Sequence, residues 1–165
     1  MTRTSAEIDD LLAAPKRVLG APRWDEAGAK AALSAALASE DGALIGGVSL
    51  RLNVLTHLSQ PSGNAILVLD GAPLQRLSFR PDHPHINPAR HPIPTELRRL
   101  KLPAGASRVY HWGDDRLWPR PDKVGVGRPL RPEPVTAEDA FALFLKICGI
   151  DGRLEPPPHR PRLEF

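Results

Sequence analysis

The chain has 165 residues, of which 41% are hydrophobic and 25% charged, with a formal net charge of +3; this composition fits one globular domain. The single cysteine, Cys148, excludes an intrachain disulfide and a cysteine-based metal cluster. No segment approaches the run of about 18 apolar residues that a membrane span requires, and no apolar signal region follows Met1, so we expect a cytoplasmic protein without membrane association.

The first forty residues predict two helices. Thr4 and Glu7 form a capping-box pattern, and the apolar residues that follow predict a short helix that ends at Pro15. A second helix is expected from about Asp25 to Ala38, because this segment is rich in alanine and places apolar residues on one helical stripe.

The middle of the chain predicts an antiparallel meander. Apolar and polar residues alternate over 48–54, which is typical of a half-buried strand. Residues 65–69 are apolar throughout and predict the central strand, and 74–79 predict a third. Turn residues at 60–64 and 70–71 separate the three strands.

The second half of the chain predicts shorter elements. Residues 95–101 are expected to form one or two helical turns, 108–112 a fourth strand and 116–118 a fifth. In the fourth strand Tyr110 and Trp112 share a face, which we expect in the core, and His111 would then point to the opposite, open face. A helix opens at Thr136, buries Phe141, Phe144, Leu145 and Cys148 and ends at Gly149.

These elements predict an α+β fold. An antiparallel β-meander of about four to five strands would pack against the N-terminal and C-terminal helices. Residues 1–150 are expected to form a single domain, and residues 151–165, with three consecutive prolines, a proline-rich C-terminal tail.

The most unusual segment is rich in proline and histidine. Eleven of the 19 prolines lie between Pro81 and Pro134, together with four of the six histidines, which are His83, His85, His91 and His111. Prolines stiffen a loop and so hold its imidazoles in place at little entropic cost. From Arg76 to Pro132 the chain has 12 Lys and Arg against 5 Asp and Glu, a balance of +7. This basic segment favours RNA, another phosphate-bearing partner or an acidic protein partner.

Two kinds of chemistry fit the histidines. His83 and His85, with Asp82, suggest a metal site, but the loop lacks strand periodicity and zinc-type spacing, so we predict no metal ligands and assign no cofactor. The alternative is general acid–base catalysis of RNA cleavage, because imidazoles titrate near neutral pH. His83, His85, His91 and His111 would be catalytic in that case, and Arg90, Lys101 and Arg108 would bind phosphate.

A second hypothesis comes from a different functional class. The same proline-rich loop would serve as a rigid docking surface of a non-enzymatic interaction module, such as an inhibitor of a defence system. The charge segregation places the RNA hypothesis first.

Short motifs in the second half of the chain resemble those of small bacterial and prophage proteins. Residues 77–88 (LSFRPDHPHINP), 110–112 (YHW) and 144–150 (FLKICGI) are similar to the pattern of TumE-type toxins of toxin–antitoxin pairs, in which a strand ending in Phe-Arg-x-Asp precedes a His-Pro-His-like loop. The resemblance implies a ribonuclease-like toxin of a mobile-element or phage-defence locus. Only His111 matches the second His-x-His of that pattern.

A competing resemblance is to ubiquitin-conjugating-enzyme-like domains. A helix, a three-strand meander, the motif Phe79-x-Pro81-Asp82-x-Pro84 and a proline-rich loop are similar to the core of that family. The family's nucleophilic cysteine follows the loop, and this chain has no cysteine there. The resemblance therefore implies a cysteine-less accessory protein that binds a partner.

Overall fold

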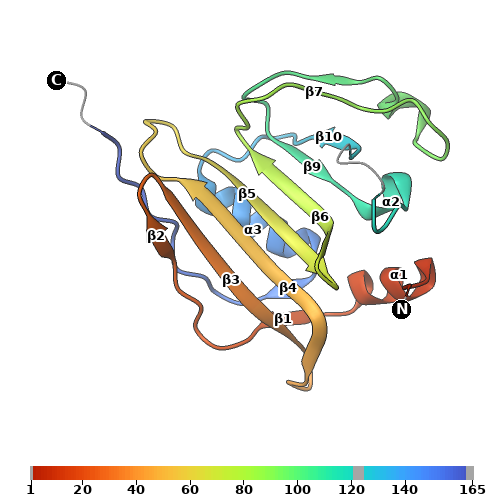
Figure 1. Cartoon of the computed structure of the whole chain (residues 1–165), viewed down its shortest axis with the longest axis horizontal. Coiled ribbons are helices and arrows are strands. Elements are labelled where there is room, and N and C mark those ends of the chain that lie inside the picture. The colour runs from red at the N-terminus through yellow and green to blue at the C-terminus, as the bar shows by residue number, and fades with distance from the viewer. Residues whose placement is uncertain (1, 121–124, 163–165) are drawn as a thin grey trace.

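The fold is α+β, with a broad sheet that is covered by helices on one face (Figure 1). The computed structural model describes residues 2–120 and 125–162. Within these ranges the helical elements are α1 (Ser5–Ala13), η1 (Thr95–Leu97), α2 (Trp112–Asp115) and α3 (Ala137–Ile147). The strands are β1 (Lys16–Val18), β2 (Asp25–Ala27), β3 (Lys30–Ser39), β4 (Leu44–Leu55), β5 (Ser62–Leu69), β6 (Ala72–Phe79), β7 (His85–Ile86), β8 (Lys101–Leu102), β9 (Arg108–Tyr110), β10 (Gly127–Pro129) and β11 (Ile150–Asp151).

An antiparallel meander of β3, β4, β5 and β6 forms the centre of the sheet, and short strands extend it at both sides. The order is β10-β9-β6-β5-β4-β3-β1-β11, and β2 pairs with β3, which gives nine strands in the part of the chain that is described. Among the described strands, only β1 and β11 pair in parallel. The prediction of four to five strands was therefore too low. Strand β3 was predicted as part of a helix, and β1, β2, β10 and β11 are two or three residues long, too short to show an alternating pattern.

The helix predicted from Asp25 to Ala38 is wrong, because the segment forms β2, a tight turn and β3. Gly28 at the turn has φ of +63°, which glycine adopts at little cost. Residues of β3 alternate between buried and exposed, and Leu33 and Leu37 lie on the buried side. Full pairing of β3 with β4 outweighs the helix propensity of the alanines.

The core lies between the sheet and the helices. Leucines on β3 to β6 point to one face, where Phe141 and Phe144 of α3 pack against them. In Figure 1, α3 lies behind the sheet, across β5 and β6. Both predicted terminal helices are confirmed with their capping boxes, at Thr4 for α1 and at Thr136 for α3. The helices thus cover one face and leave the other face of the central strands open.

The chain after β6 differs from the prediction in two places. Strand β9 ends at Tyr110, and α2 begins at Trp112, so these two aromatic residues do not share a strand face. Trp112 is buried and donates to Asp9 Oδ1 of α1 at 2.8 Å, whereas Tyr110 is only half-buried. Residues 116–118 form no strand. The polar Gly113-Asp114-Asp115 sequence favours a helical turn over continued pairing.

Buried polar groups fix the proline-rich segment between β6 and β10. The Asn87 side chain donates to Leu97 O and Gly127 O, and its Oδ1 accepts from Gly127 N at 2.8 Å. Asp115, whose side chain is fully buried, accepts two hydrogen bonds from Arg120. These contacts hold the β7–β8 hairpin against β10 and the segment around α2.

The described part of the predicted tail follows the edge of the sheet. Ile150 and Asp151 pair with β1, and Arg160 N donates to Thr56 O at 2.8 Å. The Arg160 guanidinium also pairs with Glu26 at 2.7 Å. In the described ranges, none of the helices has the length and apolar character needed to cross a membrane.

Candidate functional site on the open face of the sheet

The face of the sheet opposite α3 carries a row of side chains set by strand register. Arg51 pairs with Ile66, Ile66 with Arg76, and Arg76 with Tyr110, so the row runs across β4, β5, β6 and β9. Because alternate residues of a strand point to opposite faces, the neighbours Leu50, Leu67 and Leu77 are fully buried on the core side. Cationic and apolar side chains thus alternate along the row.

All the charged residues of the central strands are cationic. Strands β3, β4, β5, β6 and β9 contain no Asp or Glu, but they contain Lys30, Arg51, Arg76 and Arg108. Asp25 and Asp82 lie at the rim of the open face, outside these strands. Because it has cations on its strands and carboxylates only at its rim, this surface attracts anions.

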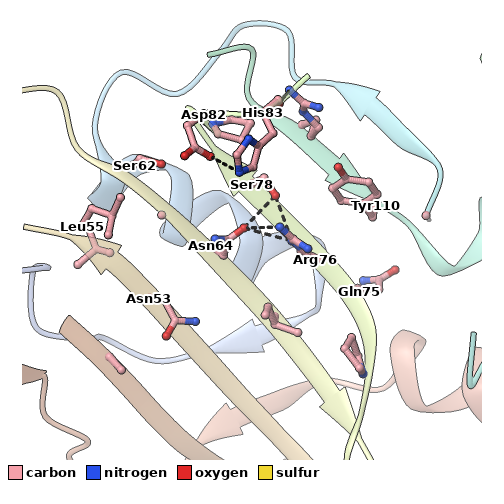
Figure 2. A pocket seen from close by; sticks show the side chains of 18 of the residues that line it. Asn53, Leu55, Ser62, Asn64, Gln75, Arg76, Ser78, Asp82, His83 and Tyr110 are labelled. Carbon is pink, nitrogen blue, oxygen red and sulfur yellow. Dashed lines mark hydrogen bonds and ion pairs between the residues drawn. The ribbon is translucent and has the colours of Figure 1, made fainter. Parts of the chain in front are cut away.

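A trough of about 1050 Å³ lies on the open face, between the strands and the segment from Pro81 to His85. We call it the sheet trough; its floor includes Asn53, Asn64, Ile66, Arg76 and Ser78 (Figure 2). Its volume lies at or above the upper end of the ~300–1,000 Å³ of small-molecule pockets. The dimensions therefore suit an extended ligand that lies across several strands.

A hydrogen-bond cluster at the centre of the trough fixes Arg76. Arg76 Nη2 and Nε donate to Asn64 Oδ1 at 2.9 and 3.1 Å, and Nε also lies 3.1 Å from Ser78 Oγ. Ser78 Oγ donates to the same Asn64 oxygen at 2.9 Å. In Figure 2, dashed lines join Asn64 to Arg76 and to Ser78, and another joins Ser78 to Arg76. These bonds hold an exposed guanidinium in one orientation at the floor of the trough.

Tyr110 and His85 form one wall beside this cluster. The Arg76 guanidinium carbon lies 5.6 Å from the centre of the Tyr110 ring, a cation–π distance. The His85 ring meets Tyr110 edge-on, with centroids 5.4 Å apart. His85 Nε2 lies 2.9 Å from Gly125 O, and it carries a hydrogen because a carbonyl only accepts. Burial, opposed by this hydrogen bond, lowers the pKa of His85 and so favours its neutral imidazole.

His83 lies at the rim of the trough, where it is widely solvated. Its Nε2 is 3.2 Å from Asp82 Oδ1, and the two side chains are 84% and 78% exposed. The structure thus brings His83 and His85 to the same trough. His83 has the freedom to reach a ligand, and Asp82 orients its ring.

The other two predicted histidines lie elsewhere. His91 is exposed, and neither His91 nor His111 is among the described residues that line the trough. His111 is half-buried next to α2, where burial lowers its pKa despite the opposing charge of Asp114. The expected turn of His111 toward the trough does not occur, because β9 ends one residue before it.

The predicted phosphate-binding cations have three different surroundings. Arg108 is 1% exposed, and its guanidinium donates to Ala106 O and Pro103 O at 3.0 and 2.8 Å. Arg90 Nη2 lies 3.6 Å from the buried carboxylate of Asp115. Lys101 is exposed on β8. Arg108, which lines the trough, is thus largely engaged with backbone carbonyls.

Two further groups bear on the chemistry. Across residues 2–120 and 125–162, no group of three or more His, Cys, Asp or Glu side chains is placed to hold a metal ion. Cys148 is fully buried at the end of α3, and burial raises the pKa of its thiol to about 11. A thiol in this state is a poor nucleophile.

The sequence reasoning did not select Arg76, Asn64 and Ser78 as site residues. Their signal was available, because Arg76 and Ser78 are polar residues at alternate positions of a predicted strand, with the buried Leu77 between them, and the five central strands lack carboxylates. Comparison of the chain with family models, curated proteins and solved structures gave no match of any of the three kinds. The resemblances to TumE-type toxins and to ubiquitin-conjugating-enzyme-like domains therefore stay predictions.

Proposed function

We propose that the protein binds a phosphate-bearing partner, single-stranded RNA, along the open face of its sheet. The observation that carries the proposal is the charge of this face: Arg51 and Arg76 lie on strands that contain no carboxylate. Phosphate contacts by Lys and Arg dominate the affinity of proteins for nucleic acids. The basic balance of the segment from Arg76 to Pro132 adds long-range attraction.

The row of side chains supports a single strand over a duplex. From Arg51 to Tyr110 the row alternates cation, apolar, cation and aromatic residues. A single strand likewise alternates phosphates and bases, and its unpaired bases stack on aromatic side chains. The sheet trough is open to solvent and extends across several strands, so it is accessible to such a ligand.

Binding of a fluorescein-labelled, unstructured RNA, followed by fluorescence anisotropy over a range of salt, tests this proposal. We expect log K to fall linearly with log salt, with a slope of about −0.7 for each phosphate contact. The single variants Arg51→Gln and Arg76→Gln, which each remove one charge, should bind more weakly and with a shallower slope. Lys146→Gln is the matched control, because Lys146 is exposed on α3, across the sheet from the trough.

Two outcomes would contradict the proposal. Equal losses of RNA affinity in Arg51→Gln, Arg76→Gln and Lys146→Gln, which each remove one charge, would mean that net charge alone is responsible. Equal competition by poly-glutamate and by unlabelled RNA would instead favour an acidic protein partner and the interaction-module hypothesis.

RNA cleavage is the second candidate function, and the positions of His83 and His85 favour it. Both line the trough that contains Arg76, burial lowers the pKa of His85 and favours its neutral form, and Asp82 Oδ1 lies 3.2 Å from His83 Nε2. A neutral imidazole can accept the 2′-hydroxyl proton, and an imidazolium can protonate the leaving oxygen. Incubation with RNA, with and without chelator, alongside His83→Ala/His85→Ala, tests this. Equal cleavage by wild type and variant, or none by either, would refute it.

A further inference from the structure

We infer that Asn64 and Arg76 form a subsite for one phosphate group, with Ser78 as a positioning residue; the inference rests on the proposed function and names its anchoring contact. The contacts of the Asn64 amide fix its orientation. Arg76 has only donors, so the Asn64 atom that faces it must be the carbonyl oxygen. Ser78 reinforces this orientation by donating its one hydrogen to the same oxygen.

Because of this amide orientation, the groups of Asn64 and Arg76 that remain without a partner among the described residues are hydrogen-bond donors. With Oδ1 facing Arg76 and Ser78, the two hydrogens of Asn64 Nδ2 are directed away from the cluster, and in the described part of the chain they form no hydrogen bond. The Arg76 Nη1 group likewise makes no hydrogen bond to a described residue. Both residues line the trough. The cluster therefore offers donors from two side chains and no vacant carbonyl acceptor.

Only a ligand with acceptors matches such a cluster. The non-bridging oxygens of a phosphate accept several hydrogen bonds and carry the charge that complements a guanidinium. A base edge or a peptide group presents donors as well as acceptors, and its donors would find no partner here. The subsite is also preorganised, because the bonds to Asn64 and Ser78 hold Arg76 in place before a ligand arrives.

The Asn64→Asp substitution tests the role of the two outward hydrogens of Asn64 Nδ2. Aspartate has the shape of asparagine and keeps an acceptor for Arg76 and Ser78, but it replaces both outward hydrogens with a second oxygen. The matched control is Asn53→Asp, which adds the same charge to the neighbouring strand, directly across from Asn64, without touching the cluster. Thermal unfolding and circular dichroism would verify that both variants fold.

The probe is inorganic phosphate, titrated into ¹⁵N-labelled protein while the side-chain signals of Asn64 and Arg76 are followed by NMR. We expect both signals to shift together in wild type, and Asn64→Asp to weaken phosphate binding about tenfold. Asn53→Asp should weaken it less than about threefold. Equal weakening by the two variants, or unchanged binding in Asn64→Asp, would overturn the subsite.

The same variants, tested with RNA, separate this inference from the proposed function. If RNA binds on the open face but Asn64→Asp binds RNA and phosphate as wild type does, the subsite is wrong and the function stands. If phosphate binds and depends on Asn64 while RNA does not bind, the subsite stands and the RNA proposal fails.

Discussion

Two adjacent residues of β6, Arg76 and Leu77, should have opposite roles if one face of the sheet is core and the other is the binding surface. Leu77 is fully buried against the helices. Truncation of a buried leucine to alanine costs about 2–5 kcal/mol. At about 2–4 °C per kcal/mol for a chain of this size, a loss of about 3 kcal/mol lowers the Tm by about 6–12 °C.

Arg76→Gln should show the reverse pattern. The guanidinium is exposed and hydrogen-bonded to Asn64 at the surface, so its replacement should change the free energy of unfolding by less than about 1 kcal/mol. Loss of one phosphate contact should reduce the salt slope of RNA binding by about 0.7. Leu77→Ala should leave that slope unchanged at temperatures where it is folded.

Differential scanning calorimetry measures the stability of both variants, and fluorescence anisotropy measures their RNA binding. The reasoning is refuted if Arg76→Gln unfolds as early as Leu77→Ala. It is equally refuted if both variants lose the same part of the salt slope, because the open face would then have no special part in binding.

Three further predictions concern buried or paired groups. Arg108→Met should lower the free energy of unfolding by about 1–3 kcal/mol in urea titrations, because it removes the hydrogen bonds that the buried guanidinium donates to Ala106 O and Pro103 O; a wild-type midpoint would contradict this. The hydrogen bonds from Arg116 and Trp112 lower the pKa of Asp9 below its ordinary value of 3.8. The ion pair between Asp9 and Arg116 therefore stabilises the fold above pH 3.8, and this stabilisation is lost as the pH falls through the lowered pKa. The stability gap between wild type and Asp9→Asn should therefore be present at pH 6 and close in acid, and a gap that widens in acid would contradict the assignment. Iodoacetamide at pH 8 should leave Cys148 unmodified in the native protein and alkylate it in denaturant, because burial raises the pKa of the thiol to about 11. Mass spectrometry detects the alkylation, and rapid alkylation of the native protein would contradict the burial of Cys148.

The elements that the sequence predicted correctly are those with a local signature. Thr4 and Thr136 begin helices because their capping boxes satisfy backbone donors within one turn. Strand β4 follows from alternation and β5 from a continuous apolar run, and the Asp70-Gly71 turn separates β5 from β6. The segment from Asp25 to Ala38 was mispredicted because alanine propensity is weak, and pairing with β4 is a long-range effect.

The site was harder to predict because it depends on cross-strand register. Asn64 and Arg76 are twelve positions apart, and they meet because β5 and β6 pair so that Asn64 lies opposite Ser78. Four histidines were predicted as site residues because they lie together in a proline-rich segment, yet the structure places only His83 and His85 of these along the trough. Strand β9 ends at Tyr110 and α2 begins at Trp112, and this change of chain direction determines where His111 lies.

The most direct test of the central claim is a map of the RNA contact surface on ¹⁵N-labelled protein by chemical-shift perturbation. The account predicts that the largest changes fall on β5, β6 and β9, at Asn64, Ile66, Arg76 and Tyr110, and that α3 is unaffected. Changes centred on α3, or on the exposed loop around His91 without the sheet, would contradict it.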